Sequence, residues 1–337
     1  MEKKAEGTVA IILLALIQGF PASGAVEVLP SINPAVVGNS VTLSLSPSTA
    51  LNSGSWAVGG SLILTWTGAQ QAVFPNHTGR ATVDVQTGAL TLTSVTVADS
   101  GDYTVQSTSP MLQASASLSV YELISNVMLT ANQKDLVEFN SAAVLTCSVS
   151  SGSSLSFLWM NGSSEVTGSD RVQITDGNST LTINNVTRYD KGPFSCRVIN
   201  PVSNGISGPV NFTISYGPDN MALTVNGRNT TSFSAGSNLT LLCSAQSNPE
   251  AQLQWAFGGE LLNTTGPLLE LLIVGEKQSG SYSCLALNNH TNVNSNITTN
   301  IMIAKSPLSG SDRRAVDVGL LPLLLFVGFL SSWQGKL

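Results

Sequence analysis

Few side chains in this sequence of 337 residues could perform covalent chemistry. Its four cysteines are Cys147, Cys196, Cys243 and Cys284. Thiols can act as nucleophiles, bind a metal ion or form disulfides, and four cysteines allow three pairings. An even number of cysteines in a secreted chain favours two disulfides, which would leave no thiolate for catalysis.

The two histidines are equally poor candidates for acid–base chemistry. Both His77 and His290 are the middle residue of an Asn-His-Thr sequence, an acceptor for N-linked glycans. Because glycan acceptors lie on the surface, we expect both histidines to be exposed loop residues and not catalytic bases. Asp99 and Asp102 are expected in a turn, and the motifs of metalloproteases, α/β-hydrolases and P-loop proteins do not occur. We predict a protein that is not an enzyme, with no cofactor, no metal ion and no small-molecule substrate.

The N-terminus is typical of a secretory signal peptide. Lys3 and Lys4 precede an apolar run at 9–17, and small residues at 22–24 offer a cleavage site.

Only 10% of residues are charged, the net charge is -6 and no run of basic residues occurs, which argues against a nucleic-acid partner. Glycans are solubilising, and ten Asn-x-Ser/Thr acceptor sequences begin at Asn76, Asn161, Asn178, Asn185, Asn211, Asn229, Asn238, Asn263, Asn289 and Asn296.

A segment of about ninety residues repeats along the chain. Variants of D-x-G-x-Y-x-C occur at 99–105 (DSGDYTV), 190–196 (DKGPFSC) and 278–284 (QSGSYSC). Upstream of each lies a strand-like run around Leu45, Cys147 or Cys243. A tryptophan follows each run, and we interpret these as Trp66, Trp159 and Trp255. Alternation of polar and apolar residues predicts an array of all-β, two-sheet sandwiches.

The repeat chooses among the cysteine pairings. A two-sheet sandwich is bridged between its sheets beside a large aromatic side chain, which favours Cys147–Cys196 and Cys243–Cys284. The first copy has Leu45 and Val105 at these positions, so an apolar contact is expected instead. Tyr103 is expected in the core. Tyr282 lies where a tyrosine hydroxyl binds the strand corner, a bond that Phe194 cannot make.

These motifs resemble the immunoglobulin superfamily over residues 25–304, and their order resembles the carcinoembryonic-antigen-related cell adhesion molecules. The resemblance implies three tandem immunoglobulin-like domains at 25–121, 122–216 and 217–304, after a signal peptide at 1–24. The first is variable-like without a disulfide, and the other two are constant-like or I-set domains with one each. Ion pairs Arg80–Asp99 and Arg171–Asp190 are also implied. Gly217-Pro218 is expected to form a turn or hinge between domains.

The glycan acceptors divide as one, four and five among the three domains. Because a contact surface cannot be covered by glycans, the first domain is the expected binding module. In the resembled family, the face of strands C, C′, F and G carries homophilic contacts, including a glutamine at the Gln106 position. Alternation within strands places candidates for this face at Thr65, Thr67, Gln70, Phe74, Thr104 and Gln106. The alternative is that Phe74 belongs to the core and the threonines are ordinary strand surface.

We therefore expect a cell-surface glycoprotein that mediates adhesion or recognition by homophilic or heterophilic protein contacts. The alternative is an anchored or secreted immune recognition or decoy protein that binds a receptor or a pathogen ligand.

The C-terminal segment predicts attachment to the outer face of the plasma membrane. After a stalk at 305–317, the tail at 318–337 contains an apolar stretch that ends at residue 330, short for a membrane span of about twenty residues. Ser309, Gly310 and Ser311 fit the attachment site of a glycosylphosphatidylinositol anchor. A short single span and secretion are the alternatives.

Overall fold

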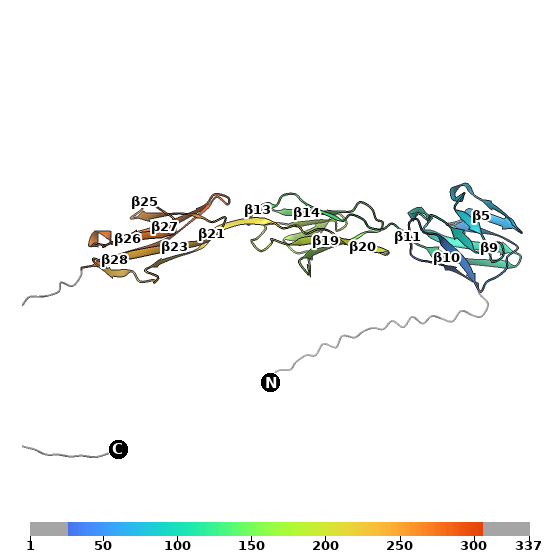
Figure 1. Ribbon diagram of the computed structural model, residues 1–337, viewed down its shortest axis with the longest axis horizontal. Helices are drawn as coiled ribbons and strands as arrows, with labels where there is room; N and C mark the ends of the chain where they lie inside the picture. The colour runs from blue at the N-terminus through green and yellow to red at the C-terminus, as the bar shows by residue number, and fades with distance from the viewer. Residues whose placement is uncertain (1–25, 306–337) are drawn as a thin grey trace, which may run out of the picture. The chain divides into compact units, whose positions relative to one another are not determined.

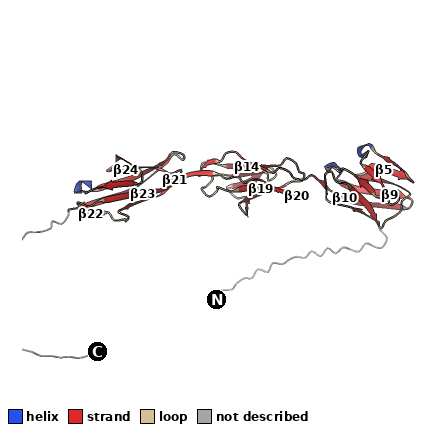
Figure 2. Ribbon diagram, in the orientation of Figure 1, coloured by secondary structure: helices blue, strands red, loops and turns tan. Residues whose placement is uncertain are grey.

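The computed structural model describes residues 26–305, so the expected signal peptide and C-terminal tail lie outside the described residues. This part of the chain consists of β-strands and three short 3-10 helices (Figures 1 and 2). It divides into two units. The first holds the described residues up to Pro218 together with Ser247–Ala251 and Asn288–Val293, and the second holds the remainder. Between residues 26 and 305, no helix has the length and apolar character needed to cross a membrane.

The first sandwich packs two antiparallel sheets. One has the order β1-β3-β8-β7 (Glu27–Pro30, Val41–Ser46, Leu90–Leu92, Ala81–Val83). The other has the order β10-β9-β4-β5-β6 (Met111–Leu118, Gly101–Thr108, Ser53–Val58, Ser61–Thr67, Gln70–Val73). The short strands β2 (Ala35–Val36) and β11 (Val120–Tyr121) pair in parallel, and the helices are η1 (Pro75–His77) and η2 (Val97–Asp99). In β3, buried Val41, Leu43 and Leu45 alternate with polar residues, because successive side chains of a strand point to opposite faces.

The tryptophan that packs at the centre of this sandwich is Trp56 and not Trp66. Trp56 on β4 lies opposite Val105, just as Trp159 lies opposite Cys196 and Trp255 opposite Cys284. Its indole Nε1 donates to the Gly88 carbonyl at 2.9 Å. The matching bonds run from Trp159 to Asn178 and from Trp255 to Gly266.

The assignment of Trp66 to the central strand is therefore wrong, although its side chain is also buried. It lies on the next strand, β5, and its Nε1 donates to the Leu51 carbonyl at 3.1 Å. The strand that carries Trp56 reads SGSWAV and has little apolar signal beside the LILTW of β5.

The middle sandwich follows the same plan. One sheet has the order β12-β14-β18-β17 (Met128–Ala131, Ala143–Ser148, Thr180–Ile183, Val172–Thr175). The other has the order β16-β15-β19-β20 (Ser164–Glu165, Ser156–Asn161, Phe194–Asn200, Ser203–Ile206). The short β13 (Asp135–Val137) pairs in parallel with the start of β21 (Thr213–Val225).

The third sandwich begins within β21. The later part of this strand shares a sheet with β23 (Leu239–Asn248) and β26 (Leu268–Leu271). The facing sheet has the order β22-β28-β27-β24-β25 (Ser232–Ser234, Val293–Ala304, Gly280–Asn288, Gln252–Phe257, Glu260–Thr265), and η3 spans Glu276–Gln278. β21 continues through Gly217 and Pro218, but Gly217 has a φ of 72°, outside the extended range, and the main segment of the first unit ends at Pro218. The expected hinge at this position stays a prediction.

Candidate functional site

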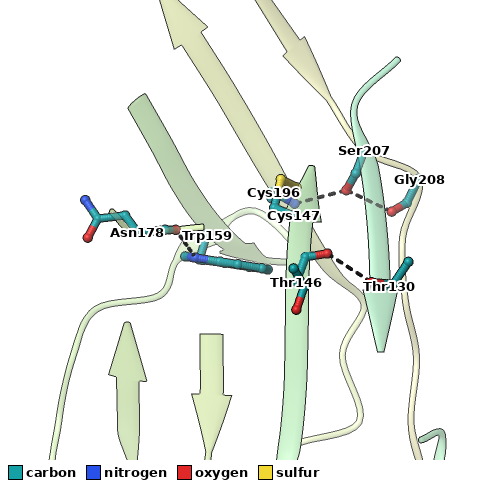
Figure 3. Close-up of a disulfide and its surroundings, with 8 residues drawn as sticks. All are labelled: Thr130, Thr146, Cys147, Trp159, Asn178, Cys196, Ser207 and Gly208. Atoms are coloured by element: carbon teal, nitrogen blue, oxygen red, sulfur yellow. Dashed lines mark hydrogen bonds between the residues drawn. A yellow bond between two sulfur atoms is a disulfide. The ribbon is translucent and has the colours of Figure 1, made fainter. Parts of the chain in front are cut away.

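The middle and third sandwiches each contain one internal disulfide. These disulfides join Cys147 to Cys196 and Cys243 to Cys284, so all four cysteines are used. Figure 3 shows the first bridge with Trp159, whose indole donates to the Asn178 carbonyl at 2.8 Å. No thiol is left for nucleophilic chemistry.

The first sandwich fills the equivalent space with aliphatic side chains. Leu45 lies opposite Val28, as Cys147 lies opposite Leu129, and Val105 takes the place of Cys196 opposite its tryptophan. Leu45 is 6% exposed and Val105 is fully buried, and both belong to one core cluster.

An ion pair closes one end of the first sandwich. The Arg80 guanidinium donates to both carboxylate oxygens of Asp99, at 2.8 and 2.9 Å. Asp99 also accepts the Thr96 N–H at 2.7 Å, and its carbonyl accepts the Tyr103 hydroxyl at 2.6 Å. Burial alone would raise the pKa of Asp99, but the bonds from Arg80 and Thr96 outweigh it and hold this pKa below its ordinary value.

The other sandwiches each keep part of this arrangement. In the middle sandwich Arg171 donates to Asp190 at 3.1 Å, and the Thr187 N–H donates to the same carboxylate at 2.7 Å. Its aromatic residue, Phe194, is buried but has no hydroxyl. In the third sandwich the neutral Gln278 side chain accepts the Gly275 N–H at 2.8 Å, and the Tyr282 hydroxyl donates to the Gln278 carbonyl at 3.0 Å.

His77 lies beside the Arg80–Asp99 pair, so its expected exposure is wrong. The side chain is 9% exposed and its Nδ1 has no hydrogen-bond partner in the described structure. Burial, followed by the charge of Arg80, lowers the pKa of His77 although Asp99 opposes the shift. Only the asparagine of a glycan acceptor must face solvent, and η1 leaves Asn76 exposed while it turns its neighbour inward. His290 is exposed, as expected.

The candidate adhesive residues lie on the five-stranded sheet of the first sandwich, with Phe74 just beyond it. Thr65 and Thr67 are on β5, Gln70 is on β6, and Thr104 and Gln106 are on β9. Gln70, Thr67 and Gln106 are exposed, Thr65 and Thr104 are half-buried, and Phe74 is 38% exposed beyond β6.

Strand register brings several of these side chains into one row. Ser55 lies opposite Thr65 on one side and Gln106 on the other, and Gln113 continues the row on β10. Residues directly opposite in a sheet share a face. Ser55 was missed because choosing Trp66 for the central strand hid the true β4, and Gln113 was missed because its place in the row depends on the pairing of β10 with β9.

A shallow hollow of about 720 Å³ lies along this row. Its lining contains no charged residue and consists of Ser53, Gly54, Ser55, Thr65, Trp66, Thr67, Gln106, Ser107, Thr108, Met111, Leu112 and Gln113. Gly54 is required in its floor, since a Cβ there would lie 2.5 Å from the Trp66 ring. Phe74, Gln70 and Thr104 do not line the hollow.

The middle sandwich also contains a buried ion pair that the sequence alone does not indicate. Arg188 and Glu138 approach to 2.6 Å, and the Arg188 guanidinium lies 3.9 Å from the centre of the Tyr216 ring. The two residues are fifty positions apart in the sequence, and no repeat or motif connects them.

The glycan acceptors are placed as surface sites. Nine of the ten asparagines are exposed, and Asn161, at the end of β15, is half-buried. The first sandwich carries Asn76 in η1, and this residue does not line the hollow.

An immunoglobulin-domain family model matches residues 127–200 and 222–288. These two segments are therefore similar to immunoglobulin domains. The chain is also 29% identical over 250 residues to the cell adhesion molecule CEACAM16 of rat and of mouse. The match covers 70% of this chain and 58% of the relative, so the chain spans a little over half the length of these relatives. The crystal structure of murine CEACAM1b is similar, with 24% identity, a TM-score of 0.47 and coverage of 56% of this chain and 99% of the other.

Proposed function

We propose that this protein mediates cell-surface adhesion or recognition, and that it binds a protein through the outer face of the sheet β10-β9-β4-β5-β6. The observation that carries the proposal is the hollowed, uncharged row of side chains around Ser55 and Gln106. The single glycan acceptor of this sandwich, outside the hollow, and the similarity to proteins named as cell adhesion molecules support it.

The absence of charge favours a second copy of the first sandwich as the partner. A two-fold contact brings the same patch of both copies together, so a patch with charges of one sign would repel itself. Serine, threonine and glutamine each provide a donor and an acceptor, which lets identical faces form hydrogen bonds with one another. The exposed Met111, at 91% accessibility, adds an apolar side chain at the rim.

Aggregation of beads that display residues 25–304 tests this function. Gln106→Arg combined with Phe74→Ala places a like charge in both copies and removes an exposed ring, so aggregation is expected to cease. Thr82→Arg, at an exposed position on β7 of the other sheet, is the matched control and should aggregate as the parent does. Equal aggregation of all three proteins would show that the face is not used.

A heterologous partner gives a different result. Parent beads would then remain dispersed but bind cells that lack this protein, and Gln106→Arg would abolish that binding.

We also propose that the signal peptide at 1–24 directs secretion and that the segment at Ser309–Ser311 receives a glycosylphosphatidylinositol anchor. Treatment of expressing cells with a phosphatidylinositol-specific phospholipase should release the protein. Retention on the treated cells would favour a short membrane span.

A further inference from the structure

The outer face of the middle sandwich differs in character from that of the first. Four aliphatic side chains lie on the sheet β16-β15-β19-β20 without packing on the core cluster, namely Leu158, Met160, Ile199 and Ile206. Ile206 is 63% exposed, and the other three are half-buried. The polar Ser156, Ser195 and Asn204 lie on the same face, and a mixed apolar and polar surface of this kind is typical of a protein contact.

Strand register places one cation in the middle of these aliphatic groups. Arg197 on β19 lies directly opposite Leu158 on β15 and directly opposite Ile206 on β20. Directly opposed residues share a face, so the exposed arginine stands between two aliphatic neighbours.

An anion lies on the same face, but away from the arginine. Glu165 on β16 is exposed and lies opposite Met160, which has the same orientation as Leu158 two residues earlier on β15. Arg197 and Glu165 are the two charged residues of these four strands, and β15 separates them. Within residues 26–305, neither one takes part in an ion pair.

No glycan acceptor projects from this face. Asn161, at the end of β15, lies opposite the buried Phe194 and therefore points away from the side that carries Met160. The other acceptors of the middle sandwich, Asn178, Asn185 and Asn211, lie outside the four strands.

We propose that this face binds the same face of a second copy of the chain, with Arg197 of each copy paired to Glu165 of the other. A two-fold axis midway between the two charges crosses β15 between Leu158 and Met160. These side chains would then meet their counterparts near the axis, and the two ion pairs would flank them. In this arrangement the arginine and the glutamate of one face each gain a partner of opposite charge, which a neutral or uniformly acidic partner does not offer.

The experiment measures self-association of residues 25–304 by sedimentation equilibrium. All proteins carry Gln106→Arg and Phe74→Ala, so that contacts of the first sandwich do not contribute and a failure of the proposed adhesive face is measured separately. Arg197→Glu and Glu165→Arg should each weaken dimerisation by about tenfold or more, because each brings like charges together. The double variant Arg197→Glu/Glu165→Arg restores both pairs and should recover the parental constant.

Lys191→Glu is the matched control, because it makes the same charge change at an exposed residue just before β19 and should leave dimerisation unaltered. Recovery in the double variant supports the proposal. Three results would each overturn it. The first is a parent that stays monomeric at the highest attainable concentration. The second is a pair of single variants that dimerise as strongly as the control, and the third is a double variant that dimerises as weakly as the single variants.

Discussion

The first and third sandwiches hold equivalent strands together by different means. The third has the Cys243–Cys284 disulfide and the Tyr282 corner, but the neutral Gln278 stands where an acidic residue would form an ion pair. The first has the Tyr103 corner and the Arg80–Asp99 pair, but Val105 lies at the bridge position.

The middle sandwich completes the comparison. It keeps the Cys147–Cys196 disulfide and the Arg171–Asp190 pair, and it lacks the tyrosine hydroxyl. Of three stabilising features, the disulfide, the arginine–aspartate pair and the tyrosine hydroxyl bond, each sandwich lacks a different one. A buried tryptophan is common to all three sandwiches. The fold depends on the packed core, and these three features are partly interchangeable ways of stabilising it.

Reduction of the disulfides should produce the largest difference between the sandwiches. Loss of either bridge is expected to cost the middle and third sandwiches about 4 kcal/mol in the free energy of unfolding, as the unfolded chain gains freedom. The first sandwich should be unaffected. Hydrogen exchange followed by mass spectrometry, with and without reductant, reports each sandwich through its own peptides. Faster exchange in the core strands of the first sandwich would contradict the comparison.

Leu45→Cys together with Val105→Cys should transfer reduction sensitivity to the first sandwich. The Cα atoms of the existing pairs are 6.3 and 6.4 Å apart, and equivalent register predicts a similar spacing here. When reduced, the variant should be about 2 to 4 kcal/mol less stable than the parent, because apolar volume has been removed. Mass spectrometry of alkylated protein checks the bridge, and two free thiols would show that the positions are not equivalent.

Arg80→Met should destabilise the first sandwich by about 2 kcal/mol at neutral pH, because the nearly buried Asp99 loses its partner. The pKa of Asp99 is held below its ordinary value, so this stabilisation is present above about pH 4 and is lost as the pH falls through the folded-state pKa. The melting temperatures of parent and variant should therefore converge at acid pH in scanning calorimetry.

Arg171→Met provides the matched comparison. Its effect should be smaller, since Arg171 is 43% exposed against 27% for Arg80 and makes one bond to its aspartate. The third sandwich should show no acid titration from this corner, because Gln278 carries no charge. A parent–variant difference that persists undiminished at pH 2 would rule out the ion pair as its cause.

Removal of the tyrosine hydroxyls should have the smallest effect. Tyr103→Phe is expected to cost about 1 kcal/mol, since it removes one buried hydrogen bond and leaves the Asp99 carbonyl without that donor. Tyr282→Phe should cost the same or less, because its bond is longer, at 3.0 Å against 2.6 Å. Denaturant titration of each variant measures both values, and no loss for Tyr103→Phe would remove the corner from the first sandwich's stabilising contacts.

The sequence by itself determined the fold class and the cysteine pairs, and its resemblance to a known family implied both arginine–aspartate pairs. These features are local in the repeat: the second and third copies each carry their own two cysteines, and alternation within a strand fixes which side chains face the core. The placement of Val105 and Leu45 also followed, because both lie at a fixed offset from a motif. The direction in which the Leu45 and Gln106 side chains point followed from alternation within their own strands, which has a period of two residues.

Only the tertiary structure decided which tryptophan occupies the central strand, since Trp56 and Trp66 lie on adjacent strands and both are buried. It also decided the burial of His77, the continuous strand through Gly217-Pro218 and the contact between Arg188 and Glu138. Each depends on register or on pairing between residues far apart in the chain, which alternation within one strand cannot specify. The row from Thr65 to Gln113 and the opposition of Arg197 to Leu158 and Ile206 arise in the same way, from the order in which strands meet.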